Sequence, residues 1–316
     1  MNQSTNLTDN NILRTLISKN LIIGLFLWGI GFTYGVAVYK WKLFPYHMLR
    51  DYYLVHLKPA PEPQPWRTDF FVDTTGRQSV DCPPENALLF LSMGQAGSAN
   101  YISSFGERNE QRNAYQLYDG KCYLIEDPML GATGVQGSLW SSLAQDISES
   151  TGRDVIFIAT GAGGSSLTDW IRDDSFYFQR TKHQIDFAKS LGYRVKLAFW
   201  YNGAREAELG TTANEYVERF NRLIEKFDLL LDDNASNQWV VFQTSKCWSD
   251  GSARVLRGQE LAAETNERVF LGPNTDAYHD RNRYDGCHLN HNAKVRINDR
   301  LKEILGPILS DSKEQQ

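Results

Sequence analysis

The sequence predicts an α/β protein with a doubly wound, mostly parallel sheet, preceded by one N-terminal transmembrane helix. Short apolar runs alternate with longer amphipathic stretches, which is typical of the strands and helices of such a sheet. A separate uncharged run near the N-terminus has the length of a membrane-spanning helix. With 316 residues, 41% of them hydrophobic, the chain can bury a large core. These observations indicate one globular α/β domain behind a membrane anchor.

The anchor is predicted from the run between Asn20 and Tyr39, which contains no charged residue. A helix of this length crosses about 30 Å of hydrocarbon. A cleaved signal peptide and a buried helix are the alternatives. The run exceeds the usual signal-peptide core and shows no A-x-A-like cleavage site, so we expect an uncleaved anchor. Gly31 and Gly35 form a G-x-x-x-G pair that would allow a dimer through this helix.

A proline-rich segment separates the anchor from the globular domain. The text KPAPEPQPW has a proline at every second position of 59–65, which favours an extended spacer. We therefore expect the domain to begin near Trp66. The expected organisation is an N-terminal tail over 1–19, the transmembrane helix over 20–41, a juxtamembrane and proline-rich spacer over 42–65, the globular domain over 66–311 and a C-terminal tail over 312–316.

The charge pattern argues against nucleic acid as a partner. The formal net charge is -5, and Lys and Arg residues form no continuous basic stripe. Nucleic-acid-binding domains concentrate positive charge on one face, because the phosphate backbone supplies most of the affinity. We therefore expect no nucleic-acid partner.

Strands and helices alternate along the domain. Apolar runs predict strands at 87–93, 154–160, 194–200 and 239–244. Amphipathic stretches predict helices over 138–149, 176–190 and 213–231. The carboxyl ends of parallel strands meet at one edge of a sheet, where open α/β sheets place their ligands. We therefore expect the loops that follow these strands to form the site.

Small and polar residues follow each strand at that edge. The first strand leads into GQAGS at 94–98, the second into GAGGSSLTDW at 161–170, and the third into YNGAREA at 201–207. Near the C-terminus, RYDGCHLNHNA places Asp285 three residues before His288. The second loop also suits an ordinary turn or a phosphate cradle. It lacks G-K-[ST], and no acidic residue follows at dinucleotide spacing, which disfavours the cradle.

Taken in order, these motifs resemble the SGNH hydrolases, in the branch of sialate O-acetylesterases and bacterial acetyl xylan esterases. That branch typically shows G-Q-S-N, then D-P followed by a glycine, then G-G-[ST] with a Trp, W-x-Q-G-E-x-D and D-G-x-H. The matching residues are Gly94-Gln95-Ala96-Gly97, Asp127-Pro128 with Gly137-Ser138-Leu139-Trp140, Gly163-Gly164-Ser165 with Trp170, Trp200-Tyr201-Asn202-Gly203-Ala204-Arg205-Glu206, and Asp285-Gly286-Cys287-His288. The resemblance covers about 87–300 and implies a flavodoxin-like three-layer sandwich.

The resemblance implies an esterase site in which the nucleophile is replaced. In the family the serine of G-Q-S attacks the ester, the histidine of D-x-x-H is its base, and the aspartate orients that histidine. His288 and Asp285 match, whereas Ala96 occupies the nucleophile position. Ser98 is a tentative replacement, or else a hydroxyl in the first turn of the following helix. The residues expected around the oxyanion and the substrate are Gln95, Gly137, Gly163, Gly164, Ser165 and Asn202.

The activity that the resemblance implies is hydrolysis of O-acetyl esters on glycans. The expected substrate is an acetylated glycan or another small ester, and no metal or organic cofactor is implied. The alternatives are a catalytically inactive glycan-binding or scaffold protein, which Ala96 favours, and transfer of the acetyl group instead of hydrolysis.

The sequence signals for membrane orientation disagree. Arg14 and Lys19 precede the anchor, whereas Lys40, Lys42 and Arg50 follow it, so the positive-inside rule favours a cytoplasmic domain by one residue. Glycan substrates of this family usually lie outside the cytoplasm. We therefore expect a single-pass protein of the inner (plasma) membrane with a periplasmic or extracellular domain.

Four cysteines bear on the same question. Their number is even, so they are compatible with two disulfides in an oxidising compartment and equally with four separate thiols. Cys247 follows a predicted strand, and Cys287 lies in the D-G-C-H loop. Because loops at one sheet edge converge, we expect these two residues to form a disulfide that braces the His288 loop.

Overall fold

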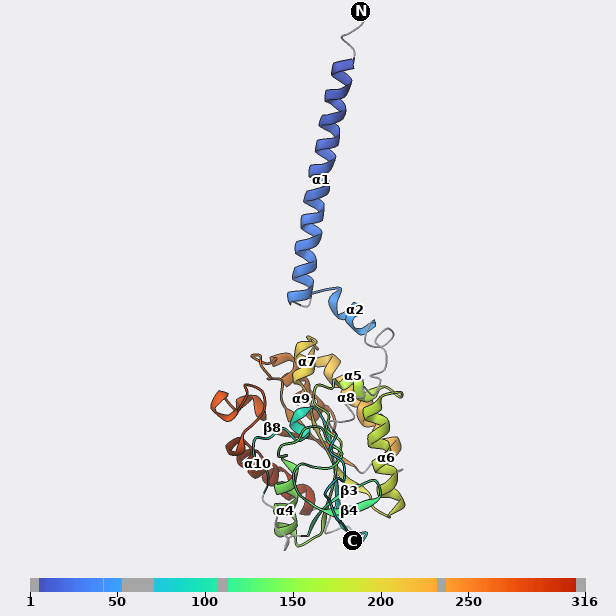
Figure 1. Cartoon of the computed structure of the whole chain (residues 1–316), viewed down its shortest axis with the longest axis vertical. Coiled ribbons are helices and arrows are strands. Elements are labelled where there is room, and N and C mark those ends of the chain that lie inside the picture. Colours follow the sequence, from blue (N-terminus) through green and yellow to red (C-terminus); the bar gives the residue numbers. More distant parts are fainter. Residues whose placement is uncertain (1–5, 42, 53–70, 107–112, 232–236, 311–316) are drawn as a thin grey trace, which may run out of the picture. The chain divides into compact units, whose positions relative to one another are not determined.

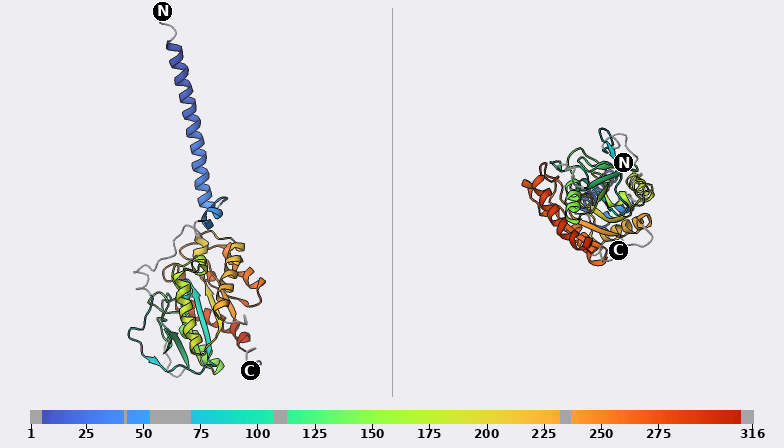
Figure 2. Two further views of the ribbon diagram at one scale, coloured as in Figure 1. Left: turned by 90° about the vertical axis from the view of Figure 1, so that its right-hand side faces the viewer. Right: turned by 90° about the horizontal axis from the view of Figure 1, so that it is seen from below.

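The computed structural model describes residues 6–41, 43–52, 71–106, 113–231 and 237–310 (Figures 1 and 2). The chain divides into two compact units, Met1–Lys58 and Pro59–Gln316. The prolines of the predicted spacer, its boundary at Trp66 and the C-terminal tail lie outside the described residues.

The described part of the N-terminal unit consists of two helices. α1 runs from Asn6 to Trp41, and α2 follows over Tyr46–Tyr52. Within α1, the segment Asn20–Trp41 has a mean hydropathy of 2.0, and none of it is buried. By length and composition this segment can cross a membrane, and it coincides with the predicted span. The expected N-terminal tail is helical from Asn6 onward and continues into this segment.

The second unit is built on a sheet of eight strands within the described residues, in the order β1-β4-β3-β5-β2-β6-β7-β8. The strands are β1 Ser79–Val80, β2 Leu88–Gly94, β3 Ala114–Tyr118, β4 Lys121–Leu124, β5 Val155–Ala159, β6 Val195–Tyr201, β7 Gln238–Gln243 and β8 Val269–Asn274. The six strands from β3 to β8 in sheet order pair in parallel, whereas β4 and β1 add antiparallel at one edge. The predicted α/β class with a mostly parallel sheet is therefore confirmed.

Helices cover both faces of the sheet and complete three layers (Figure 2). One face packs against α4 (Trp140–Thr151) and α10 (His291–Ser310). The other face packs against α5 (Leu167–Ile171), α6 (Phe176–Ser190), α8 (Ala213–Leu231) and α9 (Ala253–Thr265). Shorter elements are α7 (Ala204–Glu208) and the 3₁₀ turns η2 (Ala96–Ser98), η3 (Thr275–Ala277) and η4 (Asp280–Asn282).

The central strand β2 places the site. Leu89 and Leu91 point into one core, whereas Phe90 points into the other, which explains the continuous apolar run in the sequence. Each such side chain, when fully buried, contributes roughly 1.5–3 kcal/mol. Strands β5 and β6 flank β2, and the chain changes direction across the sheet at this point. The carboxyl end of β2 is therefore the topological switch point, where such sheets bind ligands.

Gly94 shapes the turn that leaves β2. Its φ of +119° lies in a region that L side chains rarely adopt, and a Cβ here would collide with the backbone of Tyr201. The N–H of Gln95 donates to the Tyr201 carbonyl (2.8 Å), and the N–H of Ala162 donates to the Gly94 carbonyl (2.9 Å). The turn is thus fixed to both neighbouring strands just before Ala96.

Candidate active site

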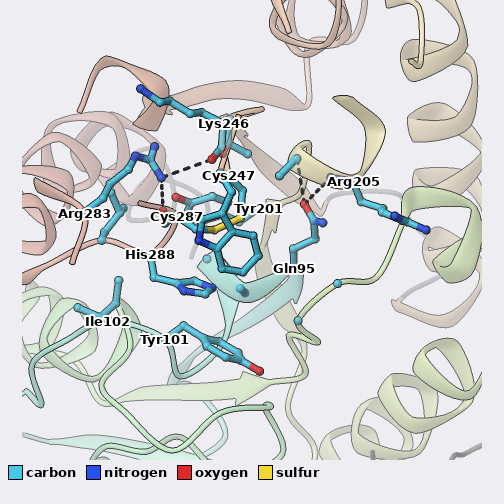
Figure 3. A pocket seen from close by; sticks show the side chains of 18 of the residues that line it. Gln95, Tyr101, Ile102, Tyr201, Arg205, Lys246, Cys247, Arg283, Cys287 and His288 are labelled. Carbon is cyan, nitrogen blue, oxygen red and sulfur yellow. Dashed lines mark hydrogen bonds between the residues drawn. A yellow bond between two sulfur atoms is a disulfide. The ribbon is translucent and has the colours of Figure 1, made fainter. Parts of the chain in front are cut away.

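A cavity of about 340 Å³ lies at the carboxyl edge of the sheet (Figure 3). Its walls come from the segments that follow β2, β5, β6 and β7 and from the loop before α10. The volume is at the lower end of the range of small-molecule sites. The loops predicted to converge at this edge therefore do converge, and they enclose a space.

His288 lines this cavity and forms a pair with Asp285, which is not itself a lining residue. Nδ1 of His288 lies 2.6 Å from Oδ2 of Asp285, whose Oδ1 accepts from the N–H groups of His288 (2.7 Å) and Cys287 (2.9 Å). Burial by itself raises the pKa of Asp285, but these hydrogen bonds outweigh it and hold the pKa below its ordinary value. The ionised carboxylate accepts a hydrogen bond from Nδ1 of His288, so Nε2 is available to accept a proton.

Aromatic rings fix the orientation of the His288 imidazole. Tyr101 stacks on it with ring centroids 4.9 Å apart and an interplanar angle of 18° (Figure 3). Trp248 meets it edge-on at 5.8 Å and 88°, and Tyr284 stacks at 6.0 Å. Only 14% of the His288 side chain is exposed. The base is therefore held in one orientation before any ligand binds.

Ala96 lines the same cavity as His288, at the start of η2. Its N–H and that of Gly97 donate to no acceptor within the described part of the chain. Unpaired backbone N–H groups of this kind can stabilise an oxyanion. The methyl group of Ala96, in contrast, cannot attack an acyl carbon. The candidate site thus brings together the predicted base, the carboxylate paired with it and two unpaired N–H groups, with alanine at the predicted nucleophile position.

Ser98, the candidate replacement for the nucleophile, is not among the residues that line the cavity. Its side chain is fully buried, and Oγ donates to the Gln95 carbonyl at 2.7 Å. Its own carbonyl accepts from the indole N–H of Trp140 at 2.8 Å. The tight η2 turn directs this side chain away from the wall that Ala96 forms. The hydroxyl therefore stabilises the turn, which corresponds to the alternative role considered above.

Three residues expected around the oxyanion and the substrate also lie outside the cavity lining. The N–H of Gly137 donates to the Ile102 carbonyl at 3.0 Å and is therefore unavailable to an oxyanion. Ser165 Oγ donates to the Ala162 carbonyl and accepts from the Trp170 indole N–H. Nδ2 of Asn202 donates to the Ser165 carbonyl at 3.0 Å. These groups connect the loops to one another instead of facing a ligand.

Gln95, Gly163 and Gly164 do line the cavity. Oε1 of Gln95 accepts from the N–H groups of Gly203 (3.0 Å) and Ala204 (3.1 Å) and so fixes the start of α7. The N–H of Gly163 donates to a threonine hydroxyl at 2.8 Å. The side-chain oxygen of Gln95 and the N–H of Gly163 are therefore committed to the fold, whereas the exposed Gly164 gives the wall no side chain.

Two long basic side chains of the cavity wall point away from the base. In Figure 3, Arg205 extends to the right and Lys246 toward the upper left, and both lead away from His288. Arg205 pairs with Glu208 at 2.6 Å. The ammonium group of Lys246 and the guanidinium group of Arg205 are therefore directed away from the space beside His288.

The residues that assemble the His288 loop were not predicted from the sequence. The buried Arg283 donates to the carbonyls of Lys246 and Cys287, and so ties the loop after β7 to the loop before α10. The indole N–H of Trp248 donates to the Asp285 carbonyl at 2.8 Å. The available signal was an arginine two residues before the D-G-C-H motif and a tryptophan directly after Cys247.

Both pairs of cysteines form disulfides, Cys82–Cys122 and Cys247–Cys287. The second is the predicted bond, and it joins the two loops that Arg283 also connects. Each pair is separated by 40 residues, so the two bonds constrain equal lengths of the unfolded chain. On the chain-entropy model each contributes about 4 kcal/mol to stability.

Because the two disulfides close loops of equal length, comparing them tests whether Cys247–Cys287 braces the His288 loop. We expect the double variants C82S/C122S and C247S/C287S to lower the free energy of unfolding by similar amounts, about 4 kcal/mol. Only the second should also impair the site, because only it releases the loop that carries His288. Urea unfolding measures the first effect, and ester hydrolysis in an Ala96→Ser background measures the second. Equal losses of hydrolysis in the two double variants would refute the brace.

Glu206 is a buried carboxyl group behind the cavity wall. It is 1% exposed; Oε1 accepts from the Leu167 N–H at 2.6 Å, and Oε2 has no hydrogen-bond partner within the described residues. Burial raises the pKa of Glu206 to about 7, although the Leu167 hydrogen bond opposes the rise. The folded chain therefore favours the protonated form.

A pH dependence of stability follows from this burial. Between its ordinary pKa of 4.5 and about 7, Glu206 binds its proton more tightly in the folded state than in the unfolded state. Stability therefore falls as pH rises through this window, by about 3 kcal/mol at most. We expect Glu206→Gln to remove this loss, measured as the change in unfolding free energy between pH 5 and pH 8. An equal change in both proteins would assign the pH dependence to other groups.

A doubly wound sheet with an Asp–His pair beside the turn after its central strand is the architecture of an SGNH-type ester hydrolase. The family model described as carbohydrate esterase, sialic acid-specific acetylesterase matches residues 131–305. The chain therefore belongs to this family of carbohydrate esterases. The matched range includes Asp285 and His288 and begins after Ala96.

Solved structures share the fold at low sequence identity. A protein from Arabidopsis thaliana aligns with a TM-score of 0.57 and 17% identity over 72% of this chain and 99% of its own. NanS aligns with a TM-score of 0.54 and 12% identity over 74% of this chain and 100% of its own. No curated protein matches the sequence. The family supports an esterase-type function, and the structural likeness supports the fold.

Proposed function

We propose that the chain binds O-acetylated glycans in this cavity and cleaves their acetyl esters, with His288 as the general base. The observation that carries the proposal is the Asp285–His288 pair, 2.6 Å apart, whose histidine lines the same cavity as Ala96. The aromatic rings around His288 suit an uncharged acyl group. Membership of the carbohydrate esterase family supports both the reaction and the substrate class.

Without a serine hydroxyl, water is the nucleophile. Nε2 of His288 takes a proton from the water, whose oxygen forms a bond to the acetyl carbon. The N–H groups of Ala96 and Gly97 donate to the resulting oxyanion. The bond from the acetyl carbon to the sugar oxygen then breaks, and His288 returns the proton to that oxygen, which releases acetate and the sugar alcohol. Sites that lack one member of a triad retain about 10³–10⁴-fold catalysis over water, so turnover should be slow.

A second candidate is glycan binding without turnover. Ala96 favours it, because alanine removes the covalent step and leaves the cavity and the Asp285–His288 pair intact. In this function the base would serve as a hydrogen-bonding group for the ligand. The acetyl-transfer alternative uses the same residues with a second sugar hydroxyl in place of water.

We further propose that the domain is anchored in the inner (plasma) membrane through Asn20–Trp41 and lies on the outer side. The span has the required length and hydropathy. Two disulfides in a family of carbohydrate esterases favour an oxidising compartment over the cytoplasm. Protease is added to intact cells. Cleavage of this domain while the cytoplasmic proteins stay intact would support the outer orientation.

Acetate release from acetylated methyl glycosides distinguishes the two candidate functions. The full chain in detergent micelles is expected to release acetate slowly, and His288→Ala is expected to reduce the rate to the uncatalysed background. The physical reason is that His288 is the proposed acceptor of the proton of the attacking water. Release at background rate by both proteins would reject hydrolysis and favour binding alone.

A further inference from the structure

Trp248 is exposed at the cavity, yet several contacts fix its position. Its side chain lines the cavity and is 69% exposed. The indole N–H donates to the Asp285 carbonyl at 2.8 Å, and the preceding residue, Cys247, is joined by a disulfide to Cys287. The ring lies perpendicular to the imidazole of His288, with centroids 5.8 Å apart. An exposed aromatic ring is therefore held beside the base.

The backbone of Trp248 is also unusual. Its φ of +51° lies in the left-handed region, which a bulky residue other than glycine rarely occupies. Such conformations cost about 1–3 kcal/mol and persist where the surroundings impose them, often at ligand-binding sites. Here the disulfide and the hydrogen bond to Asp285 impose it. The fold therefore holds a large apolar group in water at the site at an energetic cost.

The chemistry of this ring restricts what it can bind. Its N–H group is committed to Asp285, so the ligand meets the apolar face and edge of the indole, without a free hydrogen-bond donor. A pyranose ring presents a face of C–H groups that packs flat on such a surface, and its hydroxyl groups stay in water at the rim. A ring on Trp248 would lie next to His288, as a substrate with its ester group at the base requires.

We infer that Trp248 is a stacking platform for the pyranose ring whose acetyl group enters the cavity beside His288. The inference rests on the proposed function for the glycan as ligand, and it adds a residue that determines the substrate class. Trp248 would distinguish esters of sugars from esters of small alcohols, because the platform contributes to binding only when the alcohol part has an apolar ring face.

The test measures binding of methyl 6-O-acetyl-α-D-glucopyranoside to the full chain in micelles by ligand-observed NMR, with ethyl acetate as the ring-free comparison. Trp248→Ala is expected to raise the Kd for the glycoside at least tenfold and to raise the Kd for ethyl acetate by a much smaller factor. Trp248→Phe keeps an apolar ring but lacks the N–H group, so it should raise the Kd less than threefold. Phe105→Ala, an exposed aromatic residue outside the cavity lining, should have no effect.

The Trp248→Phe variant separates stacking from a structural role. If Trp248 acts only by holding the Asp285 carbonyl, Phe and Ala will weaken glycoside binding equally, and this result would overturn the inference. An unchanged glycoside Kd in Trp248→Ala, or no glycoside binding by the wild-type chain, would also overturn it. Glycoside binding through Trp248 without acetate release would support the platform and reject hydrolysis. Acetate release that is unchanged in Trp248→Ala would support hydrolysis and reject the platform.

Discussion

Replacing Ala96 with serine is expected to raise the rate of acetyl ester hydrolysis by about 100-fold or more. A hydroxyl at this position would face the cavity together with His288, which Asp285 already orients at 2.6 Å. Removing the nucleophile of an evolved serine hydrolase costs about 10⁶-fold. Because Gly137 is unavailable as an oxyanion donor here, we expect only part of that factor. Steady-state acetate release by the full chain measures it.

Two further variants define how this gain arises. Adding His288→Ala to Ala96→Ser should return the rate to the background, because an isolated serine is a poor nucleophile. Ser98→Ala in the wild-type chain should leave hydrolysis unchanged, since the Ser98 hydroxyl is buried and bonded to Gln95. Loss of wild-type hydrolysis in Ser98→Ala would instead make Ser98 the nucleophile and contradict its placement.

The second large effect concerns Asp285. In the Ala96→Ser background, Asp285→Asn is expected to lower kcat by about 10³–10⁴-fold, as the equivalent change does in a well-studied triad. An amide at this position no longer stabilises a proton on Nδ1, so the imidazole adopts the wrong tautomer for a base. The measurement is kcat at neutral pH, together with the unfolding midpoint of each variant.

Asp276 supplies a matched control for this experiment. Like Asp285, it accepts hydrogen bonds from two backbone N–H groups, those of Ser245 and Lys246, but it makes no bond to His288. Asp276→Asn should therefore lower the free energy of unfolding and change kcat little. If both substitutions lowered kcat equally, loop distortion rather than loss of the Asp285–His288 bond would explain the result.

Local sequence pattern was sufficient for the central fold. The runs that form β2, β5, β6 and β7 are apolar because these strands are buried between two helical layers, and all four were predicted to within one or two residues. Strands β1, β3, β4 and β8 were missed. β1 and β4 are short, and they join the sheet antiparallel at an edge, where the pattern of a buried parallel strand is absent. β3 has a glutamine at its centre, and β8 is the other edge strand and is only partly buried, so neither shows a long apolar run.

The site was predictable where its chemistry depends on a short motif. Asp285 and His288 are three residues apart, and the loop between them brings the carboxylate to the ring. The positions of Ser98 and Gly137 could not be read in this way. The first depends on the direction of a 3₁₀ turn, and the second on a backbone pair with Ile102, which is distant in sequence.

Trp248 shows a further limit of sequence reasoning. It lies in an irregular segment after β7, where neither periodicity nor a motif gives a residue a role. Its place at the cavity results from long-range contacts, the Cys247–Cys287 bond and the hydrogen bond to Asp285. Of these contacts, the sequence indicated only the disulfide.

Covalent capture tests most directly the central claim that this cavity is an esterase site with alanine at the position of its nucleophile. The full chain and its Ala96→Ser variant are treated with a fluorophosphonate, and intact mass and peptide mapping locate the adduct. We predict one adduct at position 96 in Ala96→Ser, and none in the wild-type chain or in Ala96→Ser with His288→Ala. An adduct on Ser98 of the wild-type chain, or no adduct in Ala96→Ser, would contradict the claim.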